Sequence, residues 1–230
     1  MKPTISIIIP AHNEENYISK TLQSIKNQTS SDYEVIVVLN GCTDDTANVL
    51  KEFKSDKLKI LSLPKANVSR ARNYGAGNAE GEILLFLDAD TYFEENALEK
   101  IKEEFNSEYS VASTKVKADS KFLKYKFAMW FKNMYTLKGF YKSCSGALIC
   151  HRNQFDKVEG YDPKIVVREH KKLINKLNTL GKYTCLDITV TTSMRRFRKW
   201  GLSKATLFWA RQWLNDHFGD LKRTNYEKIR

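Results

Sequence analysis

Residues 83–90 read ILLFLDAD and form the most informative stretch of the chain. A short, continuous apolar run such as this one is typical of a strand that is buried on both faces of a sheet. Two carboxylates, Asp88 and Asp90, follow the run directly and are separated only by Ala89. Divalent cations such as Mg²⁺ and Mn²⁺ prefer oxygen ligands and often combine one or two protein carboxylates with substrate phosphates. The stretch therefore predicts a buried strand that ends at a metal site, although acids after a strand can also serve only to cap a helix.

Further strands and helices alternate on the N-terminal side of this stretch. Short apolar runs occur at residues 5–10, 34–39 and 59–63. Between them, apolar residues recur at helical spacing over residues 16–27, 44–53 and 69–79. Strands and helices that alternate in this way, with nearly continuous apolar strands, indicate a sheet covered by helices on both faces. We therefore predict an α/β fold with a mostly parallel sheet.

Polar clusters follow three of the predicted strands. They read PAHNEE after the first strand, NGCTDD after the second and DAD after the fourth. Ligands of open α/β sheets bind outside the carboxyl ends of the strands, so all three clusters are expected at one functional edge. Helix capping at residues 13–15 and a tight turn at 40–41 would explain some of these residues without a ligand, and both are compatible with binding.

The second part of the chain has a different pattern. Strands are predicted at residues 110–117, 147–151 and 184–192, and helices at 96–105, 171–180 and about 203–218. Between Asp119 and Asp156 there is no acidic residue, and lysines alternate with aromatic side chains. Such a stretch suits anionic lipid headgroups, a phosphorylated or glycosidic acceptor, or nucleic acid. It also suits a helix whose aromatic side faces the core.

The composition limits the class of protein. The 230 residues are 42% hydrophobic and 28% charged, as expected of a globular chain of one domain with a possible C-terminal appendage. Four cysteines are scattered without a CxxC pair, so we interpret them as reduced thiols. The chain shows neither a signal-peptide pattern nor an apolar window of about 18 residues, so we expect a cytoplasmic protein that does not span a bilayer. The net charge of +11 favours phosphate-bearing partners without choosing among them.

Several motifs together resemble the family-two glycosyltransferases of the GT-A fold, a group that includes dolichol-phosphate mannose synthases and many polysaccharide synthases. The matching stretches are residues 7–15 (IIIPAHNEE), 38–46 (VLNGCTDDT), 71–75 (ARNYG), 86–90 (FLDAD), 145–147 (SGA) and 169–170 (EH) with leucines and a glycine downstream. The resemblance implies a Rossmann-like nucleotide-diphospho-sugar transferase fold. It also implies an inverting sugar transfer from a UDP- or GDP-sugar that depends on Mg²⁺ or Mn²⁺.

The resemblance implies roles for the residues of the first three motifs and of the acidic motif. Glu14 would accept hydrogen bonds from ribose hydroxyls, and Arg72 would grip the diphosphate. Asn40 stands where the family often has aspartate, and its amide can both donate to and accept from a base edge. The full predicted set for the nucleotide sugar is Pro10, Ala11, Asn13, Glu14, Asn40, Arg72, Asp88, Ala89 and Asp90, with Asp88 and Asp90 as the metal ligands.

Glu169-His170 stands where the family usually carries Glu-Asp, whose aspartate is taken as the catalytic base. Histidine can do the same work, because its ordinary pKa of about 6.5 suits proton abstraction near neutrality. Alternatively, Glu169 is the base and His170 contacts the metal or the acceptor, or His170 lies at the mouth of an inactive site. Ser145 and Gly146 are predicted on the acceptor side.

The C-terminal segment, residues 193–230, is predicted to be basic and amphipathic. From Arg195 onward it carries roughly ten cationic and three anionic side chains, which suits an anionic surface. Its predicted apolar face holds Leu207, Trp209, Trp213, Leu214 and Phe218. The segment resembles a membrane-facing one in part of the family, so we expect peripheral contact with the inner face of the cell membrane. Arg195 or Arg196 would alternatively close over the diphosphate, although the family's Gln-x-x-Arg-Trp motif is absent.

Together these features predict a catalytic domain over residues 1–192, with a nucleotide-sugar half at 1–92 and an acceptor half at 93–192. The expected acceptor is a saccharide or a polyprenyl-phosphate-type lipid, and nucleic acid is not expected as a partner. Two other classes of protein compete with this prediction. A sugar nucleotidyltransferase would carry a glycine-rich signature where this chain has residues 13–15, and a non-catalytic basic binding module is favoured only by His170.

Overall fold

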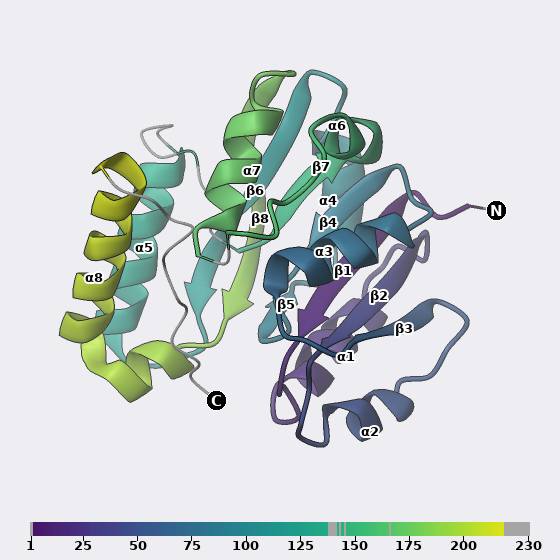
Figure 1. The fold of residues 1–230 in the computed structure, drawn as a ribbon, viewed down its shortest axis with the longest axis horizontal. Helices are drawn as coiled ribbons and strands as arrows, with labels where there is room; N and C mark the ends of the chain where they lie inside the picture. The colour runs from purple at the N-terminus through teal and green to yellow at the C-terminus, as the bar shows by residue number, and fades with distance from the viewer. Residues whose placement is uncertain (1, 138–141, 143, 145, 166, 219–230) are drawn as a thin grey trace.

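The computed structural model describes residues 2–218 except 138–141, 143, 145 and 166 (Figure 1). Its strands are β1 (Ile5–Ala11), β2 (Tyr33–Asn40), β3 (Leu58–Leu63), β4 (Ile83–Phe86), β5 (Thr91–Phe93), β6 (Tyr109–Ala118), β7 (Leu148–His151) and β8 (Lys182–Thr192). Its helices are α1 (Ile18–Lys26), α2 (Thr46–Lys51), α3 (Val68–Gly77), α4 (Ala97–Glu104), α5 (Leu123–Leu137), α6 (Arg152–Lys157), α7 (Glu169–Leu177) and α8 (Arg195–Phe218).

The strands form one mixed sheet in the order β3-β2-β1-β4-β7-β6-β8-β5. β1 runs parallel to β2 and β4, β2 runs parallel to β3, and β6 runs parallel to β8. β7 is antiparallel to both β4 and β6, and β5 is antiparallel to β8. The predicted parallel sheet is therefore present in the first half, and antiparallel pairings extend it in the second.

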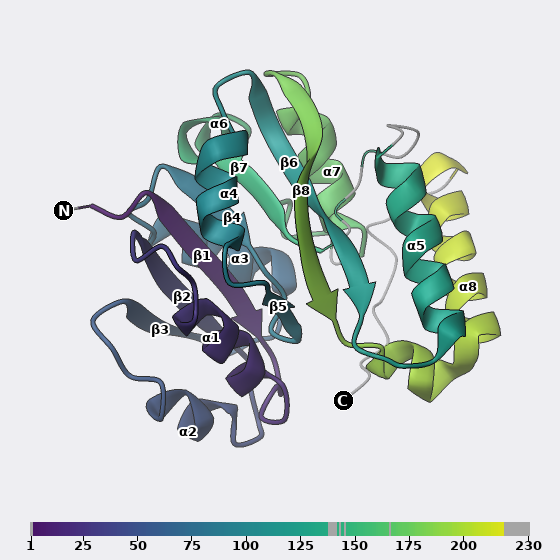
Figure 2. The same cartoon turned by 180° about the vertical axis from the view of Figure 1, so that it is seen from behind.

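Helices cover both faces of the sheet, as predicted. Ile7 and Ile9 of β1 pack with α1 and α4 on one face, and Ile8 packs with α3, α6 and α7 on the other. This alternation follows from the two-residue period of a strand, and it explains why the strand is apolar throughout. Figures 1 and 2 show these two helical layers from opposite sides.

The largest departures from the predicted elements lie in the second half. β5 and α6 were not predicted, and α7 begins at Glu169 rather than at residue 171. α8 begins at Arg195 rather than near residue 203, and it is kinked at Gly201, whose φ of 77° and ψ of 163° are non-helical. Glycine tolerates this positive φ because it has no Cβ. The helix predicted downstream of the kink is thus preceded by a short helical segment that points back toward the sheet edge.

α5 and α8 lie side by side at one end of the molecule in both views (Figures 1 and 2). α5 packs on β6 through Tyr125 and Met129, which are buried in the larger core cluster. No helix in the described part of the chain combines the length and the apolar character needed to cross a membrane. The side chains of Trp213 and Phe218, two predicted members of the apolar face of α8, lie outside what the structure describes.

Candidate functional site

The loops after β1 and β2 are joined by hydrogen bonds at the carboxyl edge of the sheet. The Asn13 side chain accepts from the backbone N–H of Thr43 at 2.8 Å, and Asn13 adopts a left-handed φ of 56°. The backbone N–H of Glu14 donates to the Thr46 hydroxyl at 2.8 Å. Asparagine is one of the few residues other than glycine that adopts this conformation readily. The two polar clusters predicted to share an edge therefore form one cross-linked unit.

Asn40 is buried at the end of β2 and is part of a local hydrogen-bond network. Its side-chain oxygen accepts from the backbone N–H of Asn67 at 2.7 Å, and its carbonyl lies 2.7 Å from Nδ1 of His12. Asn67 in turn caps α3 by accepting from the N–H of Arg70. One of the two acceptor lone pairs of the Asn40 amide is thus used inside the protein, and its amide nitrogen is the group with which it can donate to a base.

Pro10, Ala11 and Ala89 contribute mainly through the backbone. Pro10 and Ala11 end β1, with Pro10 partly exposed and Ala11 fully buried. Ala89 is buried between the two acids, and its carbonyl accepts a hydrogen bond from the Thr21 hydroxyl at 2.7 Å. This bond ties the acidic loop to α1 and limits how far Asp88 and Asp90 can move.

Arg72 connects the acidic motif to the predicted base. Its Nη2 donates to Oδ1 of Asp88 at 2.8 Å and its Nη1 donates to Oε1 of Glu169 at 2.6 Å. The Arg72 side chain is only 3% exposed, whereas that of Asp88 is 53% exposed. Gly75 brings α3 close to the sheet, because a Cβ at this position would lie 2.6 Å from Cγ2 of Ile8. Close packing of α3 therefore places a buried cation between two carboxylates of the site.

Asp90 and Glu14 share a second arginine, Arg195, from the first turn of α8. Arg195 donates to the two carboxylate oxygens of Glu14 at 2.7 and 2.8 Å, and its Nε lies 3.1 Å from Oδ2 of Asp90. The pKa of Asp90 is raised to about 7, mainly by burial; Arg195 opposes this rise, and the nearby Asp88 and Glu14 carboxylates add to it. Three carboxylates thus lie close together, and a cation beside them would favour the charged form of Asp90.

The acids of this edge fit a divalent metal ion. Asp88 presents a half-exposed carboxylate, Asp90 a nearly buried one, and carboxylate oxygens are ligands that Mg²⁺ and Mn²⁺ prefer. Within the described ranges no three His, Cys, Asp or Glu side chains are grouped closely enough to hold an ion by themselves. This donor set suits an ion that takes its remaining ligands from a phosphate group and water.

Glu169 and His170 begin α7 and lie close to this charge network. Nδ1 of His170 is 2.9 Å from the hydroxyl of Tyr161, and the two rings meet edge to face. Burial holds the pKa of His170 well below its ordinary value, and the cations Arg72 and Lys132 lower it further. His170 is thus neutral at neutral pH. If Nδ1–H donates to the Tyr161 oxygen, Nε2 keeps a free lone pair that can accept a proton.

The predicted acceptor residues are only partly described. Ser145 lies outside the described residues. At Gly146, a Cβ would lie 2.1 Å from Cγ2 of Val190 and 2.8 Å from Oγ1 of Thr114. Close approach to β6 and β8 is therefore sufficient to explain this glycine, and its contact with an acceptor remains a prediction.

Two residues near the site were not singled out for a role by the sequence. Tyr161 orients His170, and Lys132 of α5 is partly buried within electrostatic range of Asp88 and Cys144. Burial raises the pKa of the Cys144 thiol to about 12, so this cysteine is a thiol and not a thiolate. The helical period of α5 would have placed Lys132 on its inward face, but no local spacing marks Tyr161.

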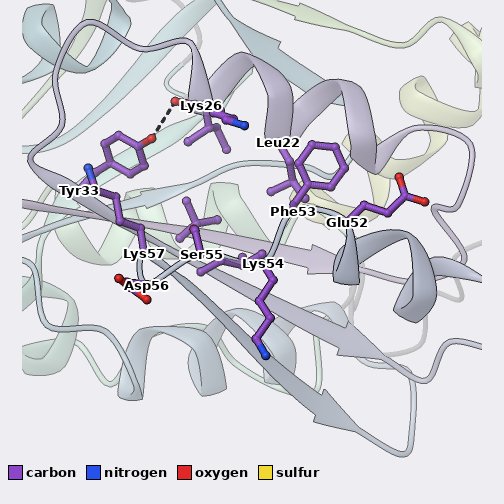
Figure 3. Close-up of a pocket in the computed structure, with 12 residues that line it drawn as sticks. Leu22, Lys26, Tyr33, Glu52, Phe53, Lys54, Ser55, Asp56 and Lys57 are labelled. Carbon is purple, nitrogen blue, oxygen red and sulfur yellow. Dashed lines mark hydrogen bonds between the residues drawn. The ribbon is translucent and has the colours of Figure 1, made fainter.

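A cavity of about 400 Å³ lies between α1 and residues 52–58, the segment that follows α2, away from the acidic edge (Figure 3). Leu22, Tyr33, Phe53 and Leu58 line it together with the Lys26, Lys54 and Lys57 side chains. Tyr33 and Leu58 begin β2 and β3, so the cavity opens at the amino ends of the parallel strands. Ligands of such sheets bind at the opposite ends, and we do not assign this cavity to the candidate site.

Comparison with known proteins identifies the family. A family model described as glycosyl transferase family 2 matches residues 6–157, which is more than half of the chain. The glycosyltransferase GlyA of Streptococcus pneumoniae is 37% identical over 99 residues, which cover 42% of this chain and 14% of GlyA. The chondroitin synthase of Pasteurella multocida is 35% identical over 112 residues, which cover 48% of this chain and 12% of the synthase. The chain thus spans a small part of these relatives.

Solved structures agree on the fold. TarS 1-349 of S. aureus superposes with a TM-score of 0.68 at 20% identity, over 86% of this chain and 63% of TarS 1-349. The mannosyltransferase PcManGT from Pyrobaculum calidifontis, solved with GDP-Man and Mn²⁺, superposes with a TM-score of 0.68 at 17% identity, over 92% of this chain and 65% of PcManGT. The chain belongs to glycosyl transferase family 2 and has the GT-A fold of its nucleotide-sugar transferases. The predicted family, fold and transferase class are confirmed, and the family match supports a glycosyltransferase over a sugar nucleotidyltransferase.

Proposed function

We propose that this glycosyltransferase moves a sugar from a UDP- or GDP-sugar to a saccharide or lipid-linked acceptor, with inversion at the anomeric carbon. The observation that carries the proposal is the meeting of Asp88, Asp90, Glu14 and the Glu169-His170 pair at one sheet edge, joined by Arg72 and Arg195. Such an edge offers the donor a metal site and a carboxylate that accepts hydrogen bonds from its ribose hydroxyls, and it offers the acceptor a base. TarS has been solved with UDP-GlcNAc and PcManGT with GDP-Man, which supports a nucleotide-sugar donor.

Asp88 and Asp90 would hold the metal ion, Mg²⁺ or Mn²⁺, whose chemistry is to neutralise the diphosphate leaving group as a Lewis acid. Arg72 keeps Asp88 in place, since its guanidinium is buried and its pKa is raised by Glu169 and Asp88 against the cost of burial. The Mn²⁺ in the PcManGT structure supports a divalent ion in this role.

Arg195 must move when the nucleotide sugar binds. In this structure it occupies both oxygens of Glu14, the residue proposed to accept hydrogen bonds from the ribose hydroxyls. A guanidinium released from Glu14 and Asp90 can pair with the diphosphate through two parallel hydrogen bonds. On donor binding, Arg195 would thus exchange the carboxylate oxygens of Glu14 and Asp90 for the oxygens of the diphosphate.

His170 is the proposed base. Its Nε2 would take the proton of the acceptor hydroxyl, and the acceptor oxygen would then form a bond to the anomeric carbon as the bond to the diphosphate oxygen breaks. Attack from the face opposite the diphosphate inverts the configuration. Tyr161 holds the imidazole ring, and Glu169 is kept from rotating by Arg72. If Glu169 is the base instead, it must leave its ion pair with Arg72.

The acceptor is proposed to be a saccharide or a polyprenyl-phosphate-type lipid, met at the inner face of the cell membrane. The chondroitin synthase relative supports a role in building polysaccharides. On α8, Leu207 and Trp209 are exposed beside Lys204 and Arg211, an arrangement suited to peripheral contact with an anionic bilayer.

The donor is tested by a thermal-shift screen of UDP-, GDP-, CMP- and dTDP-sugars with and without Mn²⁺, followed by an assay of nucleoside diphosphate release. A UDP- or GDP-sugar should raise the melting temperature with the logarithm of its concentration, and only with Mn²⁺. A shift with none of the four donors, or binding without any release of nucleoside diphosphate in the presence of acceptors, would overturn the proposal. The second outcome would favour a non-catalytic binding module.

A further inference from the structure

α5 buries Tyr125 and Met129 but carries most of its large apolar side chains on the face that points away from the protein. Leu123, Phe127 and Trp130 are 80%, 65% and 56% exposed. Leu137, two helical turns after Trp130, is half-exposed. Their spacing of four, three and seven residues places them on one side of a helix. Phe122 and Phe131 add further exposed aromatic area at its edges.

The face of α5 that is turned toward the sheet is in part polar. Asn133 donates to the carbonyl of Val116 at 2.8 Å and accepts from its N–H at 2.9 Å, so it binds the edge of β6. Lys132 and Thr136 are also turned inward. A surface helix of a water-soluble domain normally shows the reverse arrangement, with apolar residues inside and polar residues outside. A contiguous apolar patch of this kind marks a site of contact with a partner or a membrane.

Positive charge surrounds the apolar face. Lys121 just before α5 and Lys124 and Lys126 in its first turns are exposed, and no acidic residue occurs between Asp119 and Asp156. Lys124 lies over the Tyr125 ring, with Nζ 5.0 Å from its centroid. The patch is therefore complementary to an anionic surface that also offers an apolar interior.

α8 extends this face. It lies beside α5 in both views (Figures 1 and 2), and its Leu207 is 72% exposed with Trp209 and Leu214 partly exposed. Lys204 and Arg211 are exposed on the same helix. The exposed leucines of this face, unlike its aromatic residues, gain little from contact with nucleic-acid bases, whereas they gain free energy on entering hydrocarbon.

We propose that the outward faces of α5 and α8, called here the docking face, lie flat on an anionic bilayer with their aromatic and leucine side chains at the boundary between headgroups and acyl chains. This inference rests on the proposed function and identifies where the acceptor comes from. The inward side of α5 carries Lys132 within electrostatic range of Asp88, so one helix joins the docking face to the candidate site. A lipid-linked acceptor whose phosphate stays at the headgroup level would reach the site beside α5.

The experiment is sedimentation of the whole chain with vesicles of phosphatidylcholine alone and of phosphatidylcholine with phosphatidylglycerol in equal parts. The test variant carries Leu123→Ser, Phe127→Ser and Trp130→Ser. The matched control carries Ile60→Ser and Tyr74→Ser, which change exposed apolar side chains on β3 and α3. We expect the chain to bind the anionic vesicles, the test variant to bind about tenfold more weakly or less, and the control to bind as the parent does.

A second variant, Lys121→Glu with Lys124→Glu and Lys126→Glu, should lose binding to anionic vesicles mainly at low salt. Equal binding by the parent and the serine variant would overturn the proposal, as would dimerisation through this face without vesicle binding, or a preference for single-stranded RNA over vesicles. Donor-induced thermal shifts, measured on the same variants, separate this outcome from the proposed function. They should be unchanged in the serine variant, and their absence in the parent would overturn the function while leaving vesicle binding intact.

Discussion

The predicted nucleotide half, residues 1–92, differs in structure from the rest of the described chain, although both contribute strands to the same sheet. In the nucleotide half, loops from neighbouring parallel strands are cross-linked by short hydrogen bonds such as that from Thr43 to Asn13, and apolar side chains point inward. In the second half, β7 and β5 reverse direction, and α5 exposes its apolar face. The difference is consistent with the proposed roles: the cross-linked loops of the first half would hold the nucleotide, and the exposed surface of the second half would meet the acceptor.

Two arginines mark the contrast further. Arg72 comes from the nucleotide half, is buried, and has both terminal nitrogens on carboxylates that the fold holds fixed. Arg195 comes from the C-terminal helix, is partly exposed, and holds the two acids that a nucleotide sugar and its metal would use. Arg72 is thus part of a permanent framework, and Arg195 is the contact between the halves that ligand binding would break.

The largest effect is expected when the metal ligands of the nucleotide half are neutralised. Asp90→Asn should lower sugar transfer by about 10²–10³-fold and abolish the Mn²⁺-dependent thermal shift, since an amide is a poor substitute for a carboxylate on a divalent ion. The melting temperature without ligand should change little. Asp187→Asn is the control, because this exposed carboxylate of β8 forms its ion pair with Lys115 of the neighbouring strand β6. Normal sugar transfer by Asp90→Asn, or full activity of the parent in EDTA, would contradict the proposed role of a metal ion.

The next effect concerns the base, which the second half supplies. His170→Ala should lower the rate of transfer by about 10²-fold while donor affinity changes little. Glu169→Gln is the companion variant. If it abolishes transfer and His170→Ala does not, Glu169 is the base, and if both transfer sugar normally the assignment by resemblance fails at this position.

The pH dependence of the parent enzyme sharpens the same test. Burial and the neighbouring Arg72 and Lys132 hold the pKa of His170 low, and Tyr161 contacts its ring. A histidine base acts when neutral, so the acid limb of the rate profile should lie below the ordinary value of about 6.5. Stability follows the same direction. The unfolded chain binds this proton at higher pH than the folded chain, so His170 contributes stability that is lost as pH falls below about 6.5. An acid limb above that value in the rate profile would contradict the assignment.

The smallest effect is expected at the contact between the halves. Arg195→Ala should lower the free energy of unfolding by about 1–3 kcal/mol, because Glu14 is left buried without its bidentate partner while Arg195 itself is partly exposed. Mn²⁺ should stabilise this variant more than the parent, since the ion no longer competes with a guanidinium for Asp90. Arg198→Ala, which removes a more exposed pair with Asp119, is the control. If Mn²⁺ raises the melting temperature equally in the parent, Arg195→Ala and Arg198→Ala, Arg195 does not compete with the ion for Asp90.

Local patterns predicted the first half well because its information is local. The strand at residues 83–87 and the acids after it could be recognised from a run of apolar residues and two carboxylates, and β4 with Asp88 and Asp90 lies where the pattern put it. α5 was harder to predict, since its aromatic residues have a helical period but nothing in the period tells which side faces water. β5 is too short for any periodicity to reveal it.

By itself, the sequence determined the alternation of strands and helices, the acidic edge of the sheet and the family, and it proposed Glu169-His170 as the place of the base, because each depends on residues close together in the chain. Only the tertiary structure decided which charges meet. Arg195 reaches Glu14 across 181 residues, and Arg72 reaches Glu169 across 97. Such pairs depend on how closely α3 and α8 approach the sheet, which is set by packing at positions such as Gly75 and by the bend at Gly201. The spacing of residues along the chain does not predict how closely these helices approach the sheet. The charge network of the site and the exposure of the apolar face of α5 therefore follow from packing alone.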